Sequence, residues 1–312
     1  MSDSMTTPAA DRGPATAAEA SVREAQTQAL ARALRRARYE VLPLAGAADQ
    51  VEEHVPPQLT VTVTASPRRG LEPTLALAES LARRGYQTVP HLAARLVRDE
   101  AHLRELLHRT DEAGIQDVFV VAGDSEQPTG AFPDALALLG AMDRLRLAGR
   151  GQSVERVGVT GYPEGHPLIA DAQLTSALGA KAPMATYVVS QMCFDPTVVS
   201  AWLTQVRRMH VPLPLYVGVP GVVARRKLLS IAARIGVGPS ARFLTKNRGL
   251  VRLGAPGGYR PDRLVRGLAV DLATPGRDVA GLHVYTLGDI ASTERWRRRA
   301  LERLTSGRTH HG

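Results

Sequence analysis

Eight short runs rich in β-branched and aromatic residues recur along this chain, and their repetition constrains the fold more than any other feature. The runs cover residues 38–44, 59–65, 86–92, 116–122, 155–162, 185–191, 213–219 and 281–287. Segments with apolar residues at helical spacing separate most of them, and Gly85 and Gly114 stand where helices would end. Strands that alternate with helices predict a parallel sheet, because a crossover must carry the chain back before the next parallel strand begins.

Two parallel architectures compete, an open doubly wound sheet and a closed (β/α)8 barrel. The count of eight and the polar residues at the C-terminal ends of the runs favour the barrel. The usual nucleotide-binding glycine loops are absent, and the glycine-rich stretch 253–258 has the spacing of neither. We therefore expect one α/β barrel domain over residues 21–306, opening with a helix over 21–37. A disordered tail over 1–20 precedes it, and a short tail over 307–312 follows.

The net charge of +9 raises the question of a nucleic-acid partner. The excess is nearly all arginine, it is spread along the whole chain, and aromatic residues are only 4%, too few for a base-stacking platform. We interpret the charge as a solvated surface, with a small anionic ligand as the second interpretation and nucleic acid as the third. A long apolar run and a signal-peptide pattern are both missing, so we expect a cytoplasmic protein with no membrane partner. Cys193 is the single cysteine, which excludes an internal disulfide and a multi-cysteine metal site.

Polar residues at the ends of barrel strands converge on one mouth. Glu40 lies in an otherwise apolar run; if it is buried, desolvation raises its pKa and suits it to general acid catalysis, and if the strand end is ragged it is simply exposed. Asp124 follows a buried run and Gly123, and it serves either in catalysis or in a turn or helix cap. Both residues are candidates for a site at this mouth.

The remaining candidates are His91, Glu164, His166, Gln191 and Tyr285. His91 either contacts a ligand or makes a structural hydrogen bond. Glu164 and His166 are two residues apart, but no second pair of matching spacing accompanies them, so we expect no metal site. Gln191 ends the sixth run, where its amide offers a donor and an acceptor to a pterin or pyrimidine edge, or to a neighbouring strand.

In combination, several segments resemble the methylenetetrahydrofolate reductase family over residues 38–290. They are YEVLPL (39–44), TVTA (62–65), PHL (90–92), AGIQDVFVVAGD (113–124), PTG (128–130), GYPEGHP (161–167), SQMCFD (190–195) and HVYTLGD (283–289). The resemblance implies a (β/α)8 barrel that reduces 5,10-methylenetetrahydrofolate to 5-methyltetrahydrofolate with NADH or NADPH, a step of one-carbon metabolism that serves methionine biosynthesis. A homo-oligomer is compatible with it.

The same resemblance implies a role for each candidate residue. Glu40 would be the general acid that protonates N10, and Asp124 would stabilise the resulting cation. Gln191 would hold the pterin edge and Tyr285 would lie near the folate. The positions that surround FAD in the family are Thr64, His91, Tyr162, Glu164 and His166. A buried acid and an ionised carboxylate in one mouth suit this chemistry, because an iminium electrophile needs both a proton and a nearby negative charge.

The sequence departs from the family at positions that contact the FAD phosphates there. Ala122 replaces the family's arginine before Gly-Asp, and QLTSALGA (173–180) replaces a segment with two lysines and an aspartate. Arg68 and Arg69 are candidate replacements for those charges. We expect weak or absent FAD binding, with hydride passing directly from the nicotinamide to the folate. Two alternatives remain: a folate-binding barrel with other one-carbon chemistry such as methyl transfer, and a non-catalytic folate- or flavin-binding barrel.

Overall fold

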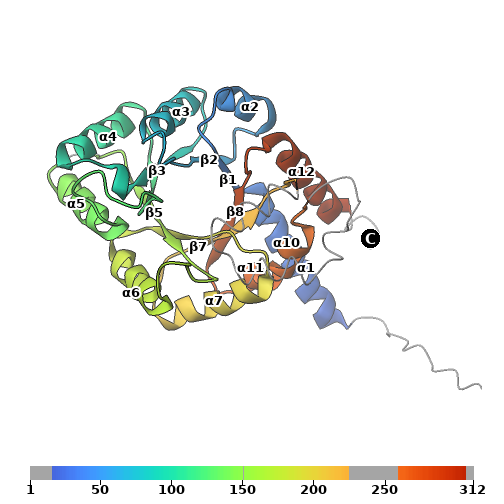
Figure 1. The fold of residues 1–312 in the computed structure, drawn as a ribbon. Helices are drawn as coiled ribbons and strands as arrows, with labels where there is room; N and C mark the ends of the chain where they lie inside the picture. The colour runs from blue at the N-terminus through green and yellow to red at the C-terminus, as the bar shows by residue number, and fades with distance from the viewer. Residues whose placement is uncertain (1–15, 150, 225–258, 307–312) are drawn as a thin grey trace, which may run out of the picture.

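A computed structural model describes residues 16–149, 151–224 and 259–306 and shows one closed barrel of eight parallel strands in sequence order (Figure 1). β1 pairs with β2 on one side and with β8 on the other, which closes the ring. The predicted barrel is therefore confirmed, and each predicted run overlaps one strand. The strands are β1 (Arg38–Val41), β2 (Thr60–Val63), β3 (Thr88–Ala93), β4 (Asp117–Val121), β5 (Arg156–Gly161), β6 (Tyr187–Ser190), β7 (Leu215–Pro220) and β8 (Val279–Tyr285).

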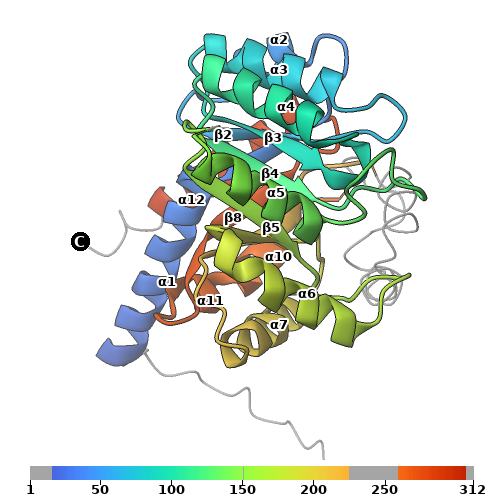
Figure 2. The same cartoon turned by 90° about the vertical axis from the view of Figure 1, so that its left-hand side faces the viewer.

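Helices surround the barrel and bury their apolar faces against the strands (Figures 1 and 2). Their first turns are capped by side chains: Asp99, Asp134 and Asp195 accept hydrogen bonds from backbone N–H groups of α4, α5 and α7. The helices are α2 (Ala47–His54), α3 (Glu72–Arg83), α4 (Glu100–Glu112), α5 (Ala135–Leu147), α6 (Asp171–Lys181), α7 (Pro196–Arg208), α10 (Asp262–Gly267), α11 (Ala269–Ala273) and α12 (Ile290–Ser306), with short 3-10 turns η1 (Ala94–Leu96) and η2 (Ala182–Met184). Within the described residues, no helix has the length and apolar character needed to span a membrane.

Helix α1 (Ala17–Arg35) starts before the position predicted from the sequence. The Thr16 side chain accepts a hydrogen bond from the Glu19 N–H, and the Glu19 carboxylate accepts one from the Thr16 N–H, a capping box that fixes the helix start. Residues 17–20 are therefore helical, which corrects the disordered tail predicted over 1–20. Residues 1–15 and the predicted tail 307–312 lie outside the described residues. The helix packs against β8, α11 and α12, while residues 16–25 are exposed.

The N-terminal end of the barrel interior is filled by a buried charged cluster. Arg38, on β1, donates hydrogen bonds of 3.0 Å to Asp117 and 2.8 Å to the Tyr187 hydroxyl, which itself donates to Asp117 at 2.7 Å. The Arg38 guanidinium also lies over the Tyr187 ring, 4.4 Å from its centre. Phe119, Val89 and Val189 pack above this cluster. The floor of the barrel is thus closed by side chains, and the open space lies at the C-terminal ends of the strands.

Candidate active site

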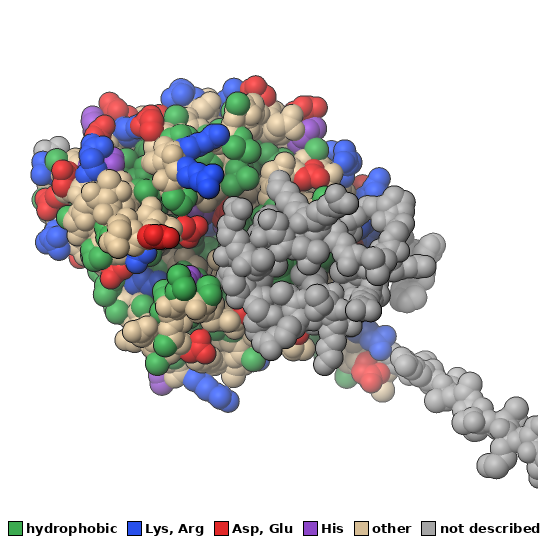
Figure 3. All heavy atoms as spheres, in the orientation of Figure 1, with side chains coloured by type: hydrophobic (Ala, Val, Ile, Leu, Met, Phe, Trp, Pro, Cys, Tyr) green, Lys and Arg blue, Asp and Glu red, His purple; other side chains and the backbone are tan. Residues whose placement is uncertain are grey.

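A cavity of about 310 Å³ lies at the C-terminal ends of the strands, on the face of the barrel that is turned to the viewer in Figure 3. Eight of the nine predicted site residues line it, namely Glu40, Thr64, His91, Asp124, Tyr162, His166, Gln191 and Tyr285. The predicted convergence of Glu40, Asp124 and Gln191 on one mouth is therefore confirmed. These residues lie on or after seven of the eight strands, with Tyr162 and His166 both after β5, and they meet only because the barrel closes.

Glu164 is the exception and corrects the prediction that placed it with the others. It lines a second cavity, also about 310 Å³, beside Trp202 on α7. The Cys193 thiol donates to a Glu164 carboxylate oxygen at 3.4 Å. The glycine that follows it, Gly165, has a positive φ of 75°, so the chain turns there and separates Glu164 from His166. Tyr162 lines both cavities and stands between them.

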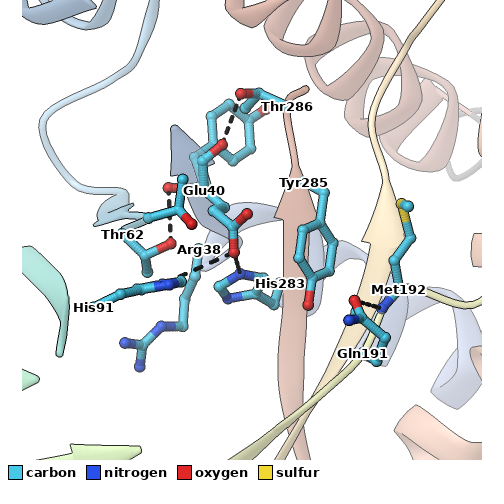
Figure 4. A network of polar contacts seen from close by, with 12 residues as sticks. Arg38, Glu40, Thr62, His91, Gln191, Met192, His283, Tyr285 and Thr286 are labelled. Atoms are coloured by element: carbon cyan, nitrogen blue, oxygen red, sulfur yellow. Dashed lines mark hydrogen bonds and ion pairs between the residues drawn. The ribbon is translucent and has the colours of Figure 1, made fainter. Parts of the chain in front are cut away.

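Glu40 is largely buried rather than exposed at a ragged strand end, which decides between the two interpretations of this residue. Its side chain is 17% exposed, and one carboxyl oxygen, Oε2, lies 3.2 Å from His283 Nε2 and 3.8 Å from His91 Nε2 (Figure 4). Burial raises the pKa of Glu40 because it penalises the charged form, while His91 acts in the opposite direction. Glu40 therefore holds a proton to higher pH than an exposed glutamate, as a general acid requires.

Both imidazoles beside Glu40 are uncharged at neutral pH. Burial lowers the pKa of His91 to about 4 and that of His283 to about 3, and the positive charge of Arg38 adds to the effect on each. The His91 ring packs against Phe119 with 4.8 Å between ring centres, and the His91 Nε2 has no hydrogen-bond partner among the described residues. The contacts to Glu40 are therefore those of neutral imidazoles and not of ion pairs.

Asp124 lies at the rim of the same cavity in a different environment. It is exposed and follows Gly123, whose φ of 90° favours glycine. The next α-helix, α5, is capped by Asp134, so Asp124 is not a helix cap. Its charge adds to burial in raising the pKa of Tyr162. One buried and one exposed carboxyl thus face the same space.

Gln191 and Tyr285 close the side of the cavity formed by β6 and β8. The Gln191 Oε1 accepts a 2.8 Å hydrogen bond from the Met192 N–H, so its amide nitrogen is the donor presented to the cavity (Figure 4). The Tyr285 hydroxyl donates to the Ser190 carbonyl at 3.1 Å. Gly218 permits this arrangement, since a Cβ there would lie 2.2 Å from the same carbonyl oxygen. Gln191 thus makes a strand-end hydrogen bond and also faces the cavity.

The described residues that line this cavity do not fit the pyrophosphate of FAD. Among these described residues Arg95 is the one lysine or arginine, and its Nε and Nη1 already donate 2.9 Å hydrogen bonds to the carbonyls of Pro133 and Ser125. Arg68 and Arg69 are exposed, and only Pro67 of their turn lines the cavity. A dinucleotide pyrophosphate carries two charges and needs dedicated donors. The described part of the cavity wall does not supply them.

The segment 173–180 lies outside the cavity around Glu40. It is part of α6, and its Leu174, Thr175 and Leu178 line the second cavity beside Glu164. The absence of the family's lysines in this segment therefore concerns the second cavity, which Tyr162 also lines. The described residues also contain no group of three or more histidine, cysteine or acidic side chains arranged to hold a metal ion.

His283 is a site residue that the sequence interpretation missed. It is 1% exposed, and on β8 it stands two residues before Tyr285, so both side chains point into the barrel. The alternation in the run GLHVYTL indicates that His283 and Tyr285 share one face of the strand, but the sequence analysis names only Tyr285, the residue nearer the strand end. The hydrogen bond to Glu40 depends on β1 and β8 pairing across the closure of the barrel, which no local pattern reveals.

The fold and the cavity define a (β/α)8-barrel protein whose ligand site lies at the C-terminal ends of the strands and contains two carboxyls. The methylenetetrahydrofolate reductase family matches residues 36–238, and the chain belongs to this family. The predicted family resemblance is confirmed.

Among solved structures, an uncharacterized protein from Clostridium thermocellum that binds two copies of 5-methyl-5,6,7,8-tetrahydrofolic acid superposes with a TM-score of 0.58 at 9% identity, covering 89% of this chain and 98% of that one. A dihydropteroate synthase from Thermus thermophilus has a TM-score of 0.44 at 15% identity, covering 88% of this chain and 95% of that one. At these identities the likeness concerns the fold alone.

Proposed function

We propose that this protein reduces 5,10-methylenetetrahydrofolate to 5-methyltetrahydrofolate with NADH or NADPH as hydride donor. The observation that carries the proposal is the pair of carboxyls in one cavity, Glu40 buried with a raised pKa and Asp124 exposed at the rim. Family membership supports an oxidoreductase. The folate bound by the Clostridium thermocellum protein supports folate as the substrate class.

The first step is proton transfer from Glu40 to N10 of the folate. The bond between N10 and the bridging carbon then breaks, its electron pair stays on N10, and the bridging carbon becomes part of a 5-iminium cation. The Asp124 carboxylate offsets this new positive charge, which lowers the energy of the cation and of the transition state that leads to it. Gln191 and Tyr285 would orient the pterin from the opposite wall of the cavity.

The second step is hydride transfer from C4 of the nicotinamide to the iminium carbon, which yields the methyl group and the oxidised dinucleotide. One proton is consumed per turnover, and Glu40 regains it from solvent. Thr64, His91, Tyr162 and His166 form the part of the cavity wall against which the nicotinamide would bind.

We propose that no flavin stands between donor and folate in this chain. A resident FAD must be held tightly through its pyrophosphate, and the described cavity wall lacks the donors for it. A diffusible donor needs only to bring its nicotinamide into the cavity while its phosphates remain in solvent. The hydride would then pass directly, with folate and donor bound together.

Initial-rate kinetics of the purified, flavin-free protein test this function. Oxidation of NADH or NADPH that depends on 5,10-methylenetetrahydrofolate, with intersecting double-reciprocal lines, supports direct transfer in a ternary complex. Parallel lines that appear only after FAD is added would contradict it. Folate binding without oxidation of either dinucleotide would favour a binding protein, and methyl transfer from 5-methyltetrahydrofolate without a dinucleotide would favour the other one-carbon chemistry.

A further inference from the structure

The His283 side chain is held between two aromatic rings. Its ring lies between Phe119, inclined by 28° at 6.4 Å between ring centres, and Tyr285, inclined by 64° at 4.9 Å. It is 1% exposed. A buried ring held on two sides has little freedom to rotate, so its nitrogen atoms keep fixed positions.

The two ring nitrogens of His283 have different surroundings. Nε2 lies 3.2 Å from Glu40 Oε2, whereas the buried Nδ1 has no hydrogen-bond partner among the described residues. If the proton were on Nδ1, a buried donor would be unpaired, and Nε2 could only accept the acidic proton of Glu40 from Oε2. With the proton on Nε2, the ring donates to Oε2 and Nδ1 is left as the unpaired acceptor. Unpaired buried N–H donors are the rarer and costlier of the two.

We propose that His283 is a positioning residue for Glu40: its Nε2–H donates to Oε2 and thereby leaves the acidic proton on Oε1, the oxygen free to meet the substrate. This inference rests on the proposed function only for the identity of the proton acceptor. In the described part of the chain, the recorded contacts of this carboxyl, to His283 and to His91, both fall on Oε2 (Figure 4). The proton on Oε1 therefore does not compete with either imidazole.

The groups around this pair keep His283 a neutral donor rather than a second acid. The titratable and charged groups that face Glu40 are Arg38 on β1, His91 on β3, and His283 and Tyr285 on β8, with Asp124 and Tyr162 elsewhere on the cavity wall. Arg38 and burial together disfavour a charged imidazole at His283. Loss of the Nε2–H would remove a donor that favours the ionised carboxylate, so the pKa of Glu40 would rise further.

Nitrogen-15 NMR of the ligand-free protein tests the hydrogen bond independently of catalysis. With histidine labelled and His283→Gln used for assignment, His283 is expected to show a protonated Nε2 and an unprotonated Nδ1 across the neutral pH range. A protonated Nδ1, a rapid mixture of the two tautomers or an imidazolium in this range would overturn the proposal. This result does not depend on whether the protein reduces folate.

Kinetics of two variants test the positioning role. His283→Leu removes the donor and should lower kcat about tenfold to hundredfold, the scale of one hydrogen bond to a charged group. It should also shift the alkaline fall of kcat to higher pH by about one pH unit, while the folate KM changes by less than about threefold. His283→Gln retains an N–H donor at similar reach. It should restore most of kcat and return the alkaline fall to the pH at which it occurs in the wild-type protein.

A purely structural role for His283 predicts a different pattern. His283→Leu would then lower kcat or the melting temperature without shifting the alkaline fall of kcat, and His283→Gln would not restore the profile; this outcome would overturn the proposal. If His283→Leu does not fold, His283→Asn takes its place, because its shorter amide cannot reach Oε2, and the same shift of the alkaline fall is expected. If the wild-type protein oxidises no dinucleotide, the proposed function fails while the NMR result still decides the hydrogen bond.

Discussion

Replacement of Glu40 by glutamine is the perturbation that the structure defines most sharply. The amide has nearly the same shape as the carboxyl, and its oxygen can take the place of the Glu40 Oε2 that lies 3.2 Å from His283 Nε2. It cannot release a proton. Glu40→Gln therefore removes the acid and little else.

The expected loss follows from the role of a positioned general acid, which contributes about 10²–10⁴-fold to the rate, or about 3–5 kcal/mol of transition-state free energy. The stability of the folded protein should not decrease. Since burial raises the native pKa of Glu40 above its unfolded value, this group favours the folded state below the unfolded pKa, and that contribution is lost as pH rises through the folded pKa. The neutral amide avoids this loss, so Glu40→Gln should be at least as stable as wild type in alkaline solution.

The assay is steady-state oxidation of the dinucleotide at saturating 5,10-methylenetetrahydrofolate, together with folate affinity and thermal unfolding. Glu126→Gln is the matched control, because Glu126 is exposed in the segment after β4 and does not line the cavity. It should retain wild-type kcat. A Glu40→Gln variant with unchanged folate affinity and more than about a tenth of wild-type kcat would refute the assignment of the acid.

Four further outcomes are expected. Wild-type kcat should fall as pH rises through the raised pKa of Glu40, as a pH–rate profile would show. Asp124→Asn should lower kcat about 10–10²-fold in the same assay, since a charge-assisted contact is lost. Gly123→Ala should reduce unfolding free energy by about 1–2 kcal/mol or more in urea, because φ is 90° and the new Cβ would lie 3.1 Å from Ala93 Cβ. Arg38→Met should reduce it by about 3–5 kcal/mol, because Asp117 is left buried without its 3.0 Å partner.

The barrel could be predicted from the sequence because its signals are local. Strand runs, helical spacing and glycines such as Gly85 and Gly114 each depend on a few neighbouring residues, and both glycines have positive φ in the structure. The mouth could be predicted too, since parallel strands that alternate with helices place their C-terminal ends together. This rule alone was enough to predict that Glu40, Asp124 and Gln191 face one cavity.

What could not be predicted depends on which side chains meet after closure. The hydrogen bond between Glu40 and His283 joins residues 243 positions apart, and the Arg38–Asp117 pair joins β1 to β4 across the barrel interior. The turn at Gly165 directs Glu164 to the second cavity, although Glu164 is only two residues from His166. The segment 173–180 likewise lines the second cavity and not the one around Glu40, a separation that its sequence does not reveal.

Direct hydride transfer to a folate iminium ion can be tested by following an isotope. Flavin-free protein is supplied with 5,10-methylenetetrahydrofolate and with NADH or NADPH that carries deuterium at the transferred C4 position, and the product is examined by mass spectrometry. We expect 5-methyltetrahydrofolate with one deuterium in its methyl group and no loss to solvent. A reduced flavin would exchange that deuterium with water, so an unlabelled methyl group, or product formed only when FAD is present, would contradict direct transfer.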